Sequence, residues 1–215
     1  MEKKMKALLI NGSPHEKGST FTALSFIKEA LNEEGVEAEI LHITNNPVSG
    51  CDGCGACRES GLNRCVIDGD IVNAILEKAE NIDALVVGAP TYFAAPNGQI
   101  LSVLDRVFYC GSGLFKGKPA AAITVARRAG TTATLSALQK YFVISGMPIA
   151  PSTYWPMIHG YNPSDVVQDK EGVQIMKMTG KTIAWLVKCI AAGETNGIYY
   201  PEVPGGEKIK TNFIR

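Results

Sequence analysis

The chain of 215 residues is 46% hydrophobic and 20% charged, enough to bury a sizeable core within the size range of one domain. Its 21 basic residues balance its 21 acidic ones, so we expect neither nucleic acid nor an anionic membrane as a partner. The sequence shows no signal-peptide core and no apolar run approaching a membrane span, which favours a cytoplasmic protein.

Short apolar runs alternate with helical patterns along the chain. Residues 5–10 and 36–43 read as strands around a helix that has Ser19 or Thr20 at its N-cap and Gly35 just past its end. The later elements are helices over 70–80, 98–109, 132–145 and 172–191 and strands over 84–89, over 120–125 and at Ile149. Five apolar strands alternating with helices predict a parallel sheet covered on both faces, a doubly wound three-layer α/β fold.

In such a sheet the ligand binds at the carboxyl ends of the strands, which points to loops 11–20, 89–98 and 126–132. Residues 45–67 form one long connection without predicted structure, and such loops are usually functional. We assign residues 1–192, with this loop, to one domain, and residues 193–215 to an extension. Its apolar side chains have no place in the five-stranded core, so we expect it to pack on a partner subunit of a homodimer or homotetramer: Tyr199, Tyr200, Phe213 and Ile214.

The loop after the first strand carries small and hydroxyl residues and then enters a helix. Free backbone N–H groups and the helix dipole make such a helix start an anion site, suited to a phosphomonoester. Five residues separate Gly12 from Gly18, and Ser19 follows, so the loop matches neither the nucleotide-triphosphatase pattern nor the dinucleotide pattern. The alternative is that both glycines serve only a tight turn.

Four of the six cysteines are crowded into one loop: Cys51, Cys54, Cys57 and Cys65. In a reducing compartment this crowding indicates metal or redox chemistry more than disulfides. Four thiolates in a loop with glycines can surround a [4Fe–4S] cluster, whereas zinc, the alternative, normally takes two separated cysteine pairs. Cys110 and Cys189 have apolar neighbours on predicted helices, so we expect them to be buried, inert thiols.

The residues Gly12-Ser13-Pro14 and Gly18-Ser19-Thr20 resemble the FMN phosphate loop of the NADPH-dependent FMN reductase family, which has a flavodoxin-like fold. Further motifs follow in the order that this family has: Gly88-Ala89-Pro90-Thr91-Tyr92-Phe93, Asn97-Gly98-Gln99 and Leu104-Asp105-Arg106. The likeness extends from residue 5 to about residue 191. Within the family, the compact cysteine motif resembles that of the iron-sulfur flavoproteins, with seven residues between Cys57 and Cys65.

This resemblance implies a set of FMN-binding residues. The residues at the phosphate would be Ser13, Gly18, Ser19 and Thr20, and those along the ribityl chain and one ring edge would be Pro90, Thr91, Tyr92, Phe93 and Asn97. Two large aromatics after a strand-ending proline usually face a cavity, although they could equally be core residues. Arg127, with Gly130 in the third loop, is a candidate donor to the flavin N1/O2 region, the alternative being an exposed arginine.

The resemblance implies an oxidoreductase in which FMN takes electrons from NAD(P)H, or from ferredoxin through the cluster, and passes them to a small-molecule acceptor. No nucleophile–base–acid triad is visible, so the cofactors would carry the chemistry. The cysteine loop follows the second strand, so it can reach a flavin in its own or a neighbouring subunit. Two alternatives stay open: a cluster-free NAD(P)H-dependent FMN or quinone reductase, and a flavodoxin-type electron carrier.

Overall fold

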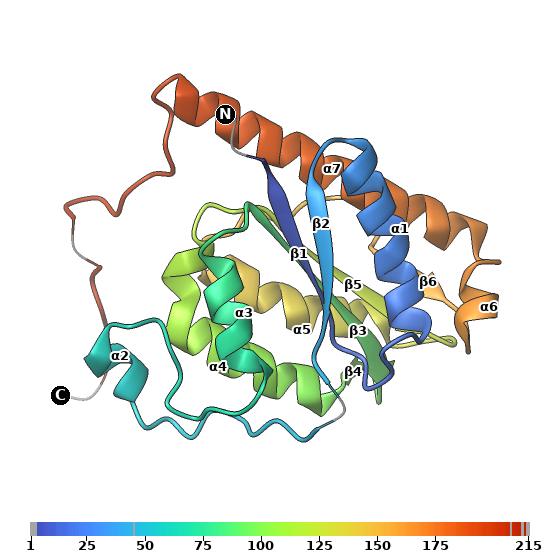
Figure 1. Ribbon diagram of the computed structural model, residues 1–215, viewed down its shortest axis with the longest axis horizontal. Helices are drawn as coiled ribbons and strands as arrows, with labels where there is room; N and C mark the ends of the chain where they lie inside the picture. Colours follow the sequence, from blue (N-terminus) through green and yellow to red (C-terminus); the bar gives the residue numbers. More distant parts are fainter. Residues whose placement is uncertain (1–3, 45, 207, 212, 214–215) are drawn as a thin grey trace.

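The computed structural model describes residues 4–44, 46–206, 208–211 and 213 (Figure 1). Its centre is a parallel sheet with the strand order β2-β1-β3-β5-β6. The strands are β1 Lys6–Asn11, β2 Glu37–His42, β3 Ala84–Tyr92, β5 Ala120–Ala126 and β6 Met157–His159, with β4 Ala95–Pro96 turning back antiparallel on the end of β3.

Helices cover both faces of the sheet. One layer consists of α1 Ser19–Glu33 and α7 Lys170–Thr195, and the other of α3 Ile71–Ala79, α4 Gly98–Phe115 and α5 Thr131–Ile144. Because successive side chains of a strand point to opposite faces, Leu8 and Ile10 pack in one core, and Ala7 and Leu9 in the other. The flavodoxin-like three-layer α/β fold is therefore confirmed.

Two short helices, α2 Ala56–Ser60 and α6 Pro163–Val166, complete the described structure. The loop 45–67 is therefore not wholly without structure, since α2 contains Cys57. No helix in the described ranges is long and apolar enough to cross a membrane.

The fifth strand lies later in the chain than the sequence predicted. Ile149 makes only an isolated bridge with Ala120, and pairing with β5 resumes at Met157. The intervening chain contains Pro151 and Pro156, whose nitrogens cannot donate to a ladder, so the continuous strand begins only after them. The predicted cap of α1 was also wrong: Gly18 holds that position, and neither Ser19 nor Thr20 caps the helix.

The helices α1 and α7 approach each other at a glycine. A Cβ atom on Gly180 would lie 2.8 Å from the carbonyl oxygen of Ile27 and 2.9 Å from the Cβ of Ala30. Both neighbours are fixed parts of α1, so a side chain there would push the two helices apart.

We therefore predict that Gly180→Ala lowers the free energy of unfolding by about 1–3 kcal/mol through overpacking. The matched control is Gly193→Ala in the same helix, where the nearest atom to an added Cβ lies 3.6 Å away. Because alanine favours a helix over glycine by about 1 kcal/mol, the control should be neutral or more stable. Urea unfolding measures both, and equal midpoints for the two variants would contradict the prediction.

Candidate functional site

Three loops meet at the carboxyl edge of the sheet, where β1, β3 and β5 end side by side. From β1 the chain crosses to β2, on one side of the sheet centre, and from β3 it crosses to β5, on the other side. Strand order therefore reverses between β1 and β3. This is the switch point at which doubly wound sheets bind ligands. The predicted flavin residues lie on these three loops and on the adjoining start of α1 and end of β3, at 13–20, 90–97 and 127–130.

The first loop is held in shape by the buried side chain of Asn11. Its Nδ2 donates to the carbonyl of Glu16 at 2.9 Å, and its Oδ1 accepts the N–H of Ser13 at 3.2 Å. His42 contacts the carbonyl of Ser13 through Nε2 at 2.8 Å, which ties the loop to the end of β2. The loop is therefore shaped by the protein before any ligand binds.

The start of α1 presents free donors to this loop. No side chain caps the helix, and within the described chain the N–H groups of Ser19 and Thr20 have no partner. Such N–H groups and the positive end of the helix dipole form an anion site. The first loop thus fits the phosphate of an FMN molecule.

The second loop bends sharply after β3. Phe93 and Ala94 both have positive φ angles, at 51° and 58°, before β4 returns the chain. Hydrogen bonds to buried residues hold the Thr91 side chain in place. Its hydroxyl oxygen lies 2.8 Å from the hydroxyl oxygen of Thr124 and accepts a hydrogen bond from the Thr134 hydroxyl at 3.1 Å. Tyr92 is 44% exposed and Phe93 fully exposed, so neither aromatic belongs to the core.

Asn97 carries the clearest sign of a missing ligand in this loop. The residue is 5% exposed at the N-cap of α4, yet within the described ranges its Oδ1 atom has no hydrogen-bond partner. A buried acceptor without a partner is costly and calls for an explanation. A donor on the flavin or its ribityl chain would satisfy it.

The third loop follows β5 and is the most open of the three. Arg127 is exposed, and Gly130 has a φ of 91° with the Cα of Ala94 only 2.7 Å from where its Cβ would lie. Only glycine allows this close approach of the second and third loops. Pro90 is half-buried at the end of β3, beside Val125 of β5.

The cysteine loop runs down the length of α4. The Gln99 side chain donates to the carbonyls of Thr44 and Asn46 at 2.9 and 2.8 Å, and Arg58 lies 4.0 Å above the ring of Tyr109. Cys57 and Cys65 lie beside Cys110, twelve residues beyond the start of α4 at Gly98, and the Cys65 sulfur also bonds to Arg106, eight residues beyond that start. At 1.5 Å per helical residue these positions lie about 12–18 Å along the helix from the flavin edge.

The four cysteines fall into two pairs. Cys51 and Cys54 are exposed, whereas Cys57 and Cys65 are each 9% exposed. Within the described chain no three metal-binding side chains already converge on one point. Gly53 and Gly55 have positive φ angles and open space around them, so the chain has room to fold the outer pair onto the inner one. Soft thiols on such a loop fit an iron-sulfur cluster.

The two remaining cysteines differ from each other. Burial and then hydrogen bonding with Cys57 raise the pKa of Cys110 to about 12, so it stays a protonated thiol at neutral pH, as expected of an inert cysteine. Cys189 is exposed on α7, so the expectation that it is buried was wrong.

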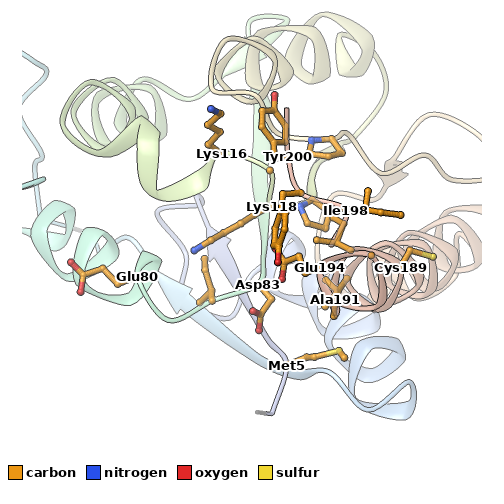
Figure 2. Close-up of a pocket in the computed structure, with 18 residues that line it drawn as sticks. Met5, Glu80, Asp83, Lys116, Lys118, Cys189, Ala191, Glu194, Ile198 and Tyr200 are labelled. Atoms are coloured by element: carbon orange, nitrogen blue, oxygen red, sulfur yellow. The ribbon is translucent and has the colours of Figure 1, made fainter. Parts of the chain in front are cut away.

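A cavity of about 640 Å³ lies at the opposite, amino edge of the sheet and contains none of the predicted site residues (Figure 2). The tail after α7 helps to line it: Tyr200 packs against Gly117 and Gly146 of its own chain, and Lys116 lies 5.1 Å above its ring. Tyr199 and Phe213 are exposed, and Ile214 lies outside the described residues.

The family model of the NADPH-dependent FMN reductases matches residues 5–162. The chain belongs to this family. It is therefore a flavin-dependent oxidoreductase.

The chain is 30% identical to an iron-sulfur flavoprotein of Methanocaldococcus jannaschii over 86% of this chain and 99% of that protein. An iron-sulfur flavoprotein of Methanosarcina thermophila is 29% identical over 86% and 97% of the two chains. A solved archaeal flavodoxin superposes with a TM-score of 0.58 at 14% identity, covering 86% and 99%, and shares the fold.

Several residues that shape the site of this flavin oxidoreductase were not predicted from the sequence. Asn11 and His42 support the first loop, Thr124 and Thr134 the second, and Arg106 the cysteine loop. Asn11 ends a strand directly before a glycine, a signal that could have been used. Arg106 belongs to the Leu104-Asp105-Arg106 motif, but its contact with the cysteine loop, like the contacts of the other three, depends on distant segments that no local pattern brings together.

We predict that Asn97→Ala weakens FMN binding about tenfold, the effect of one lost hydrogen bond, while the apoprotein keeps its stability. The reason is that the mutation removes a buried acceptor that has no partner without flavin. In the control Asn162→Ala, the lost cap bond to the N–H of Asp165 should cost about 1 kcal/mol of stability and leave FMN binding unchanged. Fluorescence titration with FMN and urea unfolding measure the two effects. An apoprotein destabilised as much as the control, with unchanged affinity, would contradict the assignment.

Proposed function

We propose that this protein uses FMN to pass electrons from NAD(P)H or ferredoxin, the latter through a [4Fe–4S] cluster, to a small-molecule acceptor. The observation that carries the flavin part is the uncapped start of α1, which aims free N–H groups at the switch point of the sheet. When bound there, FMN would supply both hydride and one-electron chemistry. A cytoplasmic location is part of the proposal.

The residues of the three loops would hold FMN by its phosphate and ring. Ser13, Gly18, Ser19 and Thr20 would bind the phosphate through N–H and hydroxyl groups. Residues 90–93 and Asn97 would line the ribityl chain and one ring edge, and Arg127 with Gly130 would lie near the pyrimidine edge. The exposed aromatics Tyr92 and Phe93 would flank the ring and leave access for a small acceptor.

Cys51, Cys54, Cys57 and Cys65 would be the cluster ligands. The iron-sulfur flavoprotein names of the relatives and the soft donor set support this proposal. The inner cysteines lie about 12–18 Å along α4 from the flavin edge, so the cluster would pass electrons to FMN in its own or a neighbouring subunit. A homodimer or homotetramer is part of the proposal, and sedimentation as a 23.0 kDa monomer would contradict that part.

One observation favours a second candidate, a cluster-free NAD(P)H-dependent FMN or quinone reductase. Cys51 and Cys54 are exposed and lie apart from the inner pair. Iron and acid-labile sulfide assays on protein purified without oxygen separate the two candidates, and steady turnover of NAD(P)H with a quinone distinguishes either enzyme from an electron carrier.

We predict that Ser19→Asp abolishes most FMN binding. The mutation places a carboxylate against the phosphate at the helix start, and repulsion plus the lost donor should cost a few kcal/mol of affinity. The control Ser136→Asp adds the same charge at an exposed position of α5 and should keep its flavin. Flavin content after purification is the measurement, and an unchanged content in Ser19→Asp would overturn the phosphate assignment.

We also predict that Cys54→Ala loses or converts the cluster but keeps FMN, because the flavin loops share no residue with the cysteine loop. Electron delivery from reduced ferredoxin should fall sharply. Iron per chain, flavin per chain and the rate of flavin reduction test this. Full flavin reduction by that donor in the variant would show that the cysteine loop is not the route.

A further inference from the structure

We propose that Arg106 is a positioning residue for the cluster: it holds the Cys65 sulfur in place before iron binds and makes the bound cluster easier to reduce. The inference rests on the proposed cluster function and deepens it. Neither the family motif nor the cysteine spacing assigns a role to this arginine.

The Arg106 side chain lies on α4 and is completely buried. Its guanidinium donates from Nε to the sulfur of Cys65 at 3.3 Å and from one terminal nitrogen to the carbonyl of Ile67 at 2.6 Å. The other terminal nitrogen donates to the carbonyl of Ser49 at 3.4 Å and to a carboxylate oxygen of Asp70. One side chain therefore ties down the chain on both sides of the four cysteines.

A buried guanidinium is costly, so this arrangement requires specific partners. Asp70 is the counter-charge, and its other oxygen caps α3 by accepting the N–H of Val72 at 3.0 Å. The carboxylate of Asp70 is therefore fixed, and it holds the guanidinium of Arg106 in one orientation. With the guanidinium held in this way, the Nε–H is directed at the Cys65 sulfur and cannot turn to another acceptor.

The backbone of Cys65 is fixed as well. Its N–H donates to the Asn73 side chain at 2.9 Å, and the Asn73 amide donates back to its carbonyl at 3.0 Å. Cys65 is therefore held at both backbone and sulfur by residues of α3 and α4. In the outer pair, by contrast, the N–H of Cys54 bonds only to the nearby carboxylate of Asp52 at 3.2 Å, and both thiols are exposed.

This contrast divides the site into an ordered half and an open half. Cys65 is already fixed, whereas Cys51 and Cys54, on their glycine-bearing loop, would have to move to bind a cluster together with it. A group that hydrogen-bonds to a metal ligand orients that ligand and tunes the metal, and hydrogen bonds to cysteine sulfurs are among the factors that set cluster potentials. A cationic N–H on the sulfur stabilises added negative charge, so the reduction potential should be raised.

The test uses full-length protein purified without oxygen and compares Arg106→Lys with Arg64→Lys. Lysine keeps the charge but cannot reproduce the aligned Nε–H. Arg64 is the matched control because it precedes Cys65 directly, yet it pairs only with the surface carboxylates of Asp68 and Glu77, both at 2.9 Å. Iron release to a chelator and the cluster midpoint potential from a redox titration followed by electron paramagnetic resonance are the readouts.

We expect Arg106→Lys to release iron about tenfold faster than wild type. Its cluster potential should also shift to a more negative value, while FMN content is unchanged. Arg64→Lys should match wild type in both readouts. If Arg106→Lys keeps the wild-type potential and release rate, the inference is wrong. If wild type itself contains no iron, the cluster proposal fails instead, so the two failures are distinguishable.

A second measurement needs no variant and covers the case in which Arg106→Lys does not fold. In wild-type protein stripped of iron, iodoacetamide followed by peptide mass spectrometry reports the reactivity of each thiol. Cys65 should be alkylated at least about tenfold more slowly than Cys51 and Cys54, as expected if its contacts persist without metal. Equal rates for Cys65 and Cys51 would show that Arg106 does not hold the sulfur, and would overturn the inference.

Discussion

The direct pairing of β1 with β3 is the contact around which the site is arranged. Asn11 pairs with Gly88, and one residue further on, the N–H of Gly12 donates to the Gly88 carbonyl at 2.8 Å. A Cβ at Gly12 would lie 2.7 Å from that oxygen and 2.8 Å from Cγ1 of Ile100, so the first loop packs directly against β3 just before the second loop begins. A flavin held by one loop is therefore necessarily in reach of the other, which is how the strand order becomes a binding site.

The helix α4 then links this site to the cysteine loop. Its N-cap is Asn97 in the second loop; it anchors the chain after β2 through Gln99, holds Cys65 through Arg106 and places Cys110 beside the inner cysteines. Both proposed cofactor sites thus use one helix as a common support.

The sequence-based predictions agree best with the structure where a feature depends only on residues close together in the chain. The strand starts and the helices around residues 27 and 183 were predictable because apolar periodicity alone defines them. The fifth strand was misplaced because β6 is only three residues long, and the prolines before it interrupt pairing in a way that apolar content does not reveal. The order of the motifs pointed to three loops, which the structure brings together at one edge of the sheet, but the hydroxyl contacts of Thr91 with Thr124 and Thr134 depend on strand neighbours far apart in the chain.

The contacts of Arg106 show most clearly what could not be predicted from the sequence. By itself the sequence determined the family, the doubly wound topology, the three loops and the four cysteines, since these depend on short motifs and on periodicity. It could not show that one arginine in an amphipathic helix would be buried with its Nε–H on a cysteine sulfur 41 residues away. Only the tertiary structure decided that, because the cost of burying a charge is offset by partners from Ser49, Ile67 and Asp70 that folding alone brings together.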